Sequence, residues 1–133
     1  MRKKNLMRFI LFLGFLVPLG GFCQDTQDNI IKWLKEGNAK ELAKVFNPAL
    51  TFSVPGHDGI YSPSQAEGFL KRFFEDNKPV SFRVSHQGKS ADGARFLIGI
   101  LTCNTGAFKV YSLTKMMEGR ERIIQFQIEP NQD

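Results

Sequence analysis

The chain has 133 residues, of which 18 are basic and 13 acidic, and its net charge is +5. Four of the basic residues, Arg2, Lys3, Lys4 and Arg8, lie in the first 23 positions, which contain no acidic residue. The remaining 110 residues carry 14 basic and 13 acidic side chains, so their charge gives no argument for nucleic acid or for an acidic partner.

Residues 1–23 have the order of a secretory signal peptide: a basic start, an apolar run from Phe9 to Val17, and a stretch rich in proline and glycine. The apolar run is shorter than the roughly 20 residues that a membrane-spanning helix needs. We therefore predict cleavage after Cys23, export to the periplasm or the exterior, and no stable membrane insertion afterwards. The alternative is a lipid anchor on Cys23, although Phe22 stands where lipoprotein signals have a small residue.

Residues 24–133 have the length of one domain, and their first part predicts two helices. In residues 25–36 the apolar side chains fall at helical spacing and Gly37 follows as a stop. Asn38 can cap a second helix, with Glu41 three residues later. The apolar face of that helix consists of Ala39, Leu42, Ala43 and Phe46.

A hairpin and a third helix come next. The segment "ALTFSVP" predicts a strand, and "GHDG" predicts the turn, because the pair Asp58-Gly59 favours positive φ angles. Ser62 then has the position of an N-cap, with Pro63 at the first helical position and Gln65 three residues after the cap. The apolar face of this helix consists of Ala66, Phe69, Leu70 and Phe73.

The remainder predicts four strands in an antiparallel meander, separated by short turns. The first strand alternates, with Phe82, Val84 and His86 on one face, and the last is expected to place Ile124, Phe126 and Ile128 together. The strand "ARFLIGILTC" is apolar on both faces. Helices followed by such a sheet predict an α+β fold, a cone whose helices cover the face that bears Phe82, Val84, Phe126 and Ile128.

Four segments in this order, "GNAKELAKVFNPAL", "GIYSPSQAEGFLKRFF", "FRVSHQGKS" and "GAFKVYSL", behind a signal peptide, resemble the family of small exported bacterial proteins called DUF4783. The resemblance extends over nearly all of residues 28–129. It implies an NTF2-like (cystatin-like) cone, in which N-terminal helices pack on a curved antiparallel sheet. It implies no catalytic or binding residue.

Few residues are candidates for catalysis. His86 extends the apolar face of its strand and is a weak candidate for a general base at a pocket rim, and Tyr61 for a phenol donor. His57 is expected in a solvated turn and Cys103 as a small buried side chain. Neither a metal site nor a cofactor site is predicted, because the histidines and cysteines are far apart and no phosphate-binding glycine pattern is present.

Three functions stay open. The first is a non-catalytic binding or accessory module of the cell envelope, whose cone holds a small apolar or amphipathic ligand or whose sheet docks a partner. Its pocket-lining candidates are Trp33, Phe69, Phe73, Phe82, Val84 and Phe126. The second is a homodimer that pairs through the sheet, with Leu97, Leu101, Tyr111 and Leu113 on the outer side. The third is an enzyme of proton transfer or hydrolysis, for which the strands supply almost no inward carboxylate.

Overall fold

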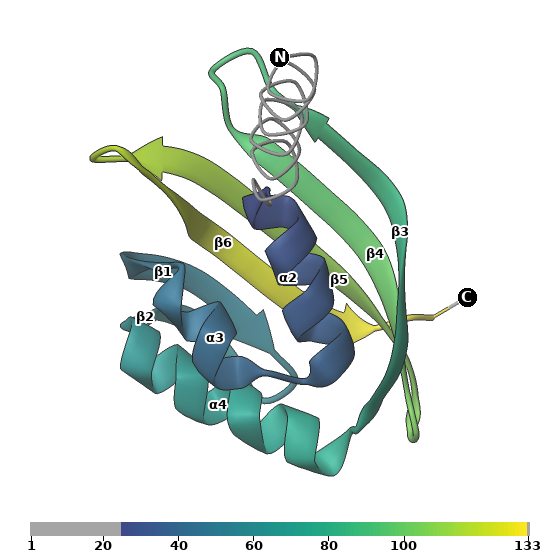
Figure 1. Cartoon of the computed structure of the whole chain (residues 1–133). Coiled ribbons are helices and arrows are strands. Elements are labelled where there is room, and N and C mark those ends of the chain that lie inside the picture. Colours follow the sequence, from purple (N-terminus) through teal and green to yellow (C-terminus); the bar gives the residue numbers. More distant parts are fainter. Residues whose placement is uncertain (1–24, 133) are drawn as a thin grey trace, which may run out of the picture.

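The computed structural model describes residues 25–132, and the predicted signal peptide lies outside this range. Figure 1 shows the helices lying on one side of a curved sheet. In chain order the elements are α2 (Thr26–Glu36), α3 (Ala39–Lys44), β1 (Phe46–Val54), β2 (His57–Tyr61), α4 (Pro63–Asp76), β3 (Pro79–Lys89), β4 (Arg95–Cys103), β5 (Gly106–Met117) and β6 (Arg120–Pro130). The predicted α+β class is confirmed.

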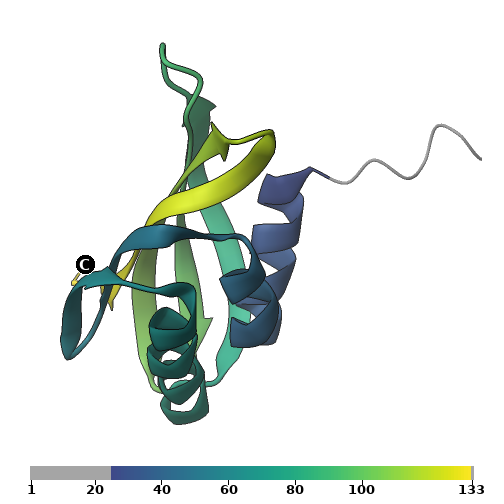
Figure 2. The ribbon, with the colours of Figure 1, turned by 90° about the vertical axis from the view of Figure 1, so that its left-hand side faces the viewer.

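The sheet has six strands in the order β2-β1-β6-β5-β4-β3. The predicted meander from β3 to β6 is confirmed, because each of these strands pairs antiparallel with the next. The β1–β2 hairpin joins the sheet at β6, where β1 runs parallel to its neighbour. Figure 2 shows the sheet curving around the helices, so that it has an inner face toward them and an outer face away from them.

The helix starts follow the predicted caps. The Asn38 side chain accepts a hydrogen bond from the Glu41 backbone N–H at 3.1 Å. Ser62 and Gln65 form the reciprocal capping box of α4. One boundary was predicted wrongly: α3 ends at Lys44, and Phe46 begins β1 instead of completing the helical face, although its side chain is still buried.

The hairpin turn also differs from the prediction. Val54 pairs with His57, so the two-residue loop is Pro55-Gly56, and Asp58 and Gly59 belong to β2. Gly56 has φ 92°, and proline followed by glycine is the pattern of a type II turn. His57 is therefore the first residue of a strand rather than part of a turn.

Two register shifts change which face some side chains occupy. In β3 the shift between Val84 and His86 leaves Ser85 unpaired, so His86 pairs with Ile98 and lies on the outer face. In β6 the shift leaves Ile124 unpaired and turns Ile123 inward, where it is fully buried. The predictions that placed His86 with Val84 and Ile124 with Phe126 were wrong for the same reason.

The faces of β4 are also the reverse of the prediction. Leu97 pairs with Ser112 and Leu101 with Phe108, and both leucines are fully buried on the inner face. The outer face of β4 instead carries Phe96, Ile98 and Ile100. Tyr111, which pairs with Ile98, lies on the outer face as predicted, as does Leu113.

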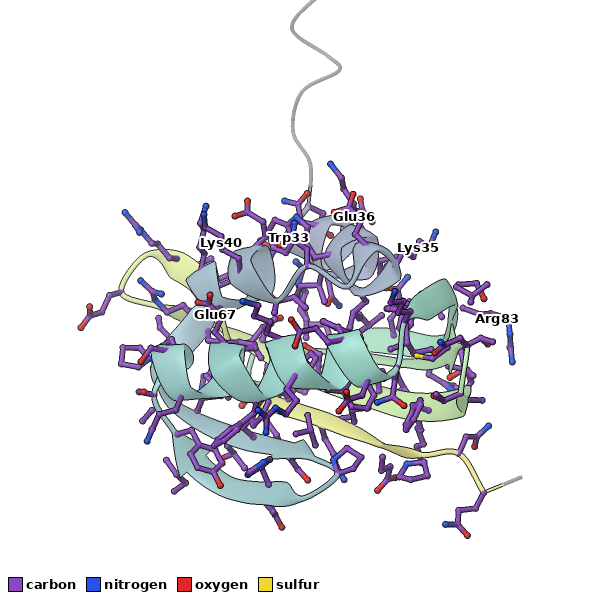
Figure 3. The ribbon with its side chains drawn as sticks, turned by 90° about the horizontal axis from the view of Figure 1, so that it is seen from below. Trp33, Lys35, Glu36, Lys40, Glu67 and Arg83 are labelled. Atoms are coloured by element: carbon purple, nitrogen blue, oxygen red, sulfur yellow. The ribbon has the colours of Figure 1, made fainter. Side chains whose placement is uncertain are left out.

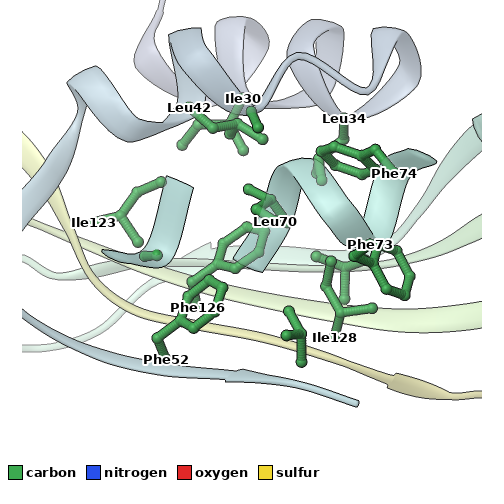
Figure 4. Packing of buried hydrophobic residues seen from close by; sticks show 14 of the residues in the cluster. Ile30, Leu34, Leu42, Phe52, Leu70, Phe73, Phe74, Ile123, Phe126 and Ile128 are labelled. Atoms are coloured by element: carbon green, nitrogen blue, oxygen red, sulfur yellow. The ribbon is translucent and has the colours of Figure 1, made fainter. Parts of the chain in front are cut away.

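The core fills the space between the helices and the inner face (Figure 4). Its centre is a group of packed rings, in which Phe126 lies 5.6 Å from Phe46 and 6.0 Å from Phe52 between centroids. Helix α2 contributes Ile30 and Leu34, which are fully buried. The inner space of the cone is thus occupied by the protein's own side chains.

Candidate functional site

The residues predicted to line a pocket lie in the core or at its margin. Phe73, Phe82 and Phe126 are buried, while Trp33, Phe69 and Val84 are partly buried against the core. Figure 3 shows Trp33 among the side chains of α2 and α3. Phe69, Phe73 and Phe126 each border a hollow that opens at the surface.

Tyr61 lies in an aromatic group at the end of the inner face. Its ring stands edge-on to Phe69 at 5.0 Å and to Phe52 at 6.1 Å. His57 covers the same group, because its ring lies flat against Phe69 with centroids 3.9 Å apart. These contacts give Tyr61 and His57 packing partners but no carboxylate partner among the residues that the structure describes.

His86 does not reach the inner face, because the bulge at Ser85 turns it outward next to Ile98. Its side chain is exposed. The buried polar side chains of residues 25–132 are Gln27, Ser112 and Thr114, so this part of the chain contains no buried acid that could act with a histidine or a tyrosine.

Those three buried polar residues were not identified from the sequence. The Gln27 amide donates to the Phe96 carbonyl at 3.3 Å and the Thr114 hydroxyl to the Arg95 carbonyl at 3.3 Å. The Ser112 hydroxyl, which faces inward between Leu97 and Phe126, has no partner within the described residues. Alternation along β5 could have placed Ser112 inside, since it shares a face with Val110.

Arg95 forms the main ion-pair network of the described chain, and it too was missed. Its guanidinium donates to both oxygens of Glu121, at 2.8 and 2.9 Å, and also binds the Asp25 carboxylate. The hydrogen bond from Arg95 lowers the pKa of Asp25, and the two carboxylates raise the pKa of Arg95. These ion pairs link Asp25, at the start of α2, to Arg95 in β4 and Glu121 in β6. We therefore assign them a structural role.

Cys103 is buried, as predicted, and burial raises the pKa of its thiol. A thiol in this state is a poor nucleophile at neutral pH. Residues 25–132 hold no group of three or more histidine, cysteine or acidic side chains that could bind a metal ion. Nor does any helix within these residues have the length and hydropathy to cross a membrane.

A hollow of about 380 Å³ lies between the α2–α3 connection and α4, where Figure 3 shows Lys40 and Glu67. Charges of both signs line it: Glu36, Lys40, Glu67 and Lys71. Alternating charges of this kind favour no particular ligand.

The outer face of the sheet is divided into an apolar half and a polar half. Partly buried apolar side chains on β4 and β5 form what we call the outer patch, which consists of Phe96, Ile98, Ile100, Tyr111 and Leu113. The neighbouring strands β1, β2 and β6 present polar side chains around a shallow hollow of about 160 Å³, namely Thr51, Ser53, Asp58, Gln125 and Gln127.

The strand pairings show which side chains of the apolar and polar halves lie next to each other on the outer face. One row crosses all six strands on the outer face, in the order Asp58, Ser53, Gln127, Tyr111, Ile98 and His86. The parallel row through Leu113 and Phe96 ends at Ile60, which is 75% exposed. Apart from Ile60, the side chains at the margins of the outer face along these rows are polar or absent, while its centre is apolar, as in many protein interfaces.

Comparison with known proteins gives the same fold and one family. The family model "Domain of unknown function (DUF4783)" matches residues 27–129. A crystal structure of a DUF4783 family protein from Bacteroides uniformis is 30% identical, with a TM-score of 0.76, and the match covers 82% of this chain and all of that one. A second family member, from Bacteroides fragilis, is 27% identical with a TM-score of 0.70 over 77% of this chain and 95% of that one.

More distant structures share the fold alone. An NTF-2 like protein of unknown function from Silicibacter pomeroyi is 12% identical, with a TM-score of 0.55 over 79% of this chain and 89% of that one. No curated protein matches the sequence. The chain therefore belongs to the DUF4783 family, and its domain has the NTF2-like fold.

Proposed function

We propose that this protein is an exported, non-catalytic accessory module of the cell envelope that acts by binding through the outer face of its sheet. Export rests on the signal-like residues 1–23 and their cleavage after Cys23. The binding role rests on the arrangement of apolar side chains. The observation that carries it is that the cone is filled by packed rings, whereas the apolar side chains of the outer patch are only partly covered.

The filled cone argues against both alternative uses of the interior. Phe46, Phe52 and Phe126 occupy the space that a small apolar ligand would need. Catalysis of proton transfer or hydrolysis inside the cone would need a titratable side chain that faces inward and acts as a general acid or base. The buried polar side chains of the described residues are neutral, the partly buried Arg95 is occupied by its ion pairs with Asp25 and Glu121, and His86 lies on the other side of the sheet.

The outer patch has the composition of an interface centre. Aromatic and aliphatic residues gather at the middle of interfaces, whereas charged residues are depleted there. Ile98 and Tyr111 stand directly opposite each other at the middle of the patch, and Ile100 lies beside them on β4. A partner that covers the patch removes these side chains from water, which favours association by about 25 cal/mol per Å² of apolar area.

A second copy of the same chain is the partner that fits the rim of the patch. Lys109 and Glu129 stand opposite each other on the outer face, and Lys109 also pairs with Ile100. A rim with both charge signs can meet its own copy across a twofold axis without net repulsion, because each cation can approach the partner's carboxylate. The homodimer predicted from the sequence is therefore retained as a proposal, with Leu97 and Leu101 replaced by Ile98 and Ile100.

Sedimentation equilibrium of the processed protein tests the proposal. We expect a dimer at tens of micromolar, and we expect Ile98→Lys to give a monomer because it buries a charge at the middle of the patch. The matched control is Val80→Lys, which makes the same kind of change at an exposed position outside the patch and should leave the dimer intact. A monomer at every concentration, or equal effects of the two variants, would contradict the proposal.

A further inference from the structure

A groove runs between the β1–β2 hairpin and α4, which lie side by side in Figure 2. It consists of two adjoining hollows, of about 400 and 210 Å³, that share His57, Phe69 and Arg72. The larger hollow is also lined by Ser64, Gln65 and Gly68, and the smaller one by Val54, Pro55, Phe73, Asp76 and Asn77. The larger hollow is in the size range of small-molecule sites.

The wall of the larger hollow is aromatic. The His57 ring lies flat on Phe69, with an angle of 14° between the planes, and Tyr61 supports Phe69 from its edge. His57 is exposed, whereas Phe69 is partly buried. The stack therefore gives the groove a flat wall that can contact an apolar ligand body.

Two polar side chains of the larger hollow, Gln65 and Arg72, have N–H groups that can donate to a ligand, and its other polar groups, Ser64 and His57, can donate or accept. The side-chain oxygen of Gln65 (Oε1) already accepts hydrogen bonds from the Ser62 backbone N–H and the Ser62 hydroxyl. The N–H groups of the Gln65 side chain are therefore available to another partner. Arg72 is exposed, and none of the ion pairs within residues 25–132 involves it. No acidic residue lines this hollow, whereas Asp76 borders the smaller one. A set of donors with one free cation favours an anion.

Gly68 is the independent observation that points to a ligand. It lies in the middle of α4, where glycine is less favourable than any residue except proline. A side chain at this position would meet nothing within 4 Å, so neither packing nor a positive φ angle requires glycine. The absent side chain keeps the hollow open along the helix, next to Phe69 and one turn before Arg72.

We propose that the larger hollow is a binding site for a small carboxylate with a flat apolar body. The carboxylate accepts hydrogen bonds from the Arg72 guanidinium and from the Gln65 amide. The flat body lies over Gly68 against the wall that His57 and Phe69 form. This site goes beyond the proposed function and does not depend on it, because the groove borders α4 and the hairpin rather than the outer patch.

The test is an NMR titration of the ¹⁵N-labelled protein, expressed with its own leader, with benzoate as the probe. We expect saturable shifts of the Gly68 and Phe69 amide signals. Neutral benzamide, which has nearly the same shape, should bind about tenfold more weakly. If benzoate gives no saturable shifts up to its solubility limit, or if benzamide binds equally well, the proposal is wrong.

Variants separate the site from a general effect of charge. Arg72→Gln should weaken benzoate binding by about tenfold, while Lys71→Gln, which removes the same charge from the neighbouring residue on another side of α4, should leave it unchanged. Gly68→Leu should abolish binding by filling the hollow. Gly68→Ala provides a further check, because it should raise the unfolding temperature and weaken binding together. Wild-type affinity in both Arg72→Gln and Gly68→Leu would overturn the assignment.

Discussion

Replacing Gly99 by alanine tests how β3 packs against β4 on the inner face of the sheet. Gly99 pairs with Val84 and is buried on the inner face. A Cβ atom at this position would lie 2.3 Å from Cζ and 2.8 Å from Cε1 of Phe82, and 2.7 Å from the backbone oxygen of Arg83. All three distances are far shorter than a normal carbon contact of about 3.5 Å.

The cost of this substitution follows from what must move. The Phe82 ring is 6% exposed and packed in the core, so it cannot turn into solvent, and the Arg83 carbonyl belongs to the neighbouring strand. Overpacking typically costs about 1–3 kcal/mol. Because a ring and a backbone atom are both displaced, we expect a loss of about 3 kcal/mol, reduced by up to about 1 kcal/mol through the lower flexibility of alanine in the unfolded chain. Urea unfolding followed by Trp33 fluorescence measures the difference.

Two further variants make the result specific. Phe82→Leu in the Gly99→Ala background removes the ring contacts, so the two changes together should cost less than the sum of the single changes. Gly68→Ala, where the space is open, should instead stabilise the protein by about 0.5–1 kcal/mol. If Gly99→Ala were neutral, Phe82 would not cover Gly99, and the pairing of Val84 with Gly99 on the inner face would be refuted.

The remaining predictions concern buried polar groups, an ion pair and a helix cap. Ser112→Ala should leave stability unchanged or raise it by about 1 kcal/mol, because the buried hydroxyl has no partner within residues 25–132. Thr114→Val, which removes a hydrogen bond to the Arg95 carbonyl, should cost about 1 kcal/mol; chemical denaturation of both variants checks this, and a loss for Ser112→Ala would show that its hydroxyl has a partner. Arg95→Gln should cost about 1–2 kcal/mol at pH 7. The pKa of Asp25 is lower in the folded protein than its unfolded value of about 3.9, so its ion pair with Arg95 stabilises the fold above that pH and less as the pH falls through the folded pKa. The stability lost in Arg95→Gln should therefore be smaller at pH 3 than at pH 7. A loss that does not change with pH would contradict the ion-pair network. Ser62→Ala should cost about 1 kcal/mol in thermal unfolding, and no change would mean that the capping box contributes nothing.

Local signals in the sequence were sufficient to predict which helices and strands form, although the end of α3 and the hairpin turn were predicted wrongly. Ser62 and Gln65 define the start of α4 through side-chain chemistry that acts within four residues, and the structure contains the predicted capping box. The alternation in β3 likewise predicted a strand with Phe82 on the inner face. Such signals depend on neighbours along the chain, so they can be recognised without the tertiary structure.

The faces of the strands were harder to predict, and the candidate site depended on them. A bulge adds one residue to a strand and reverses which side chains face inward beyond it. The residue types around Ser85 and Ile124 give no signal that predicts such a bulge. Strand β4 is apolar on both faces, so Leu97 and Ile98 could exchange places without violating the pattern. The ion pairs of Arg95 join residues 26 and 70 positions away, which no local pattern contains.

The most direct test of the account is a native mass spectrum of the protein purified from the cell envelope of its own host. Pairing through the outer patch predicts the mass of two processed chains, each without a small molecule retained in the filled cone. A single chain at tens of micromolar would contradict the account, because it would leave the outer patch uncovered.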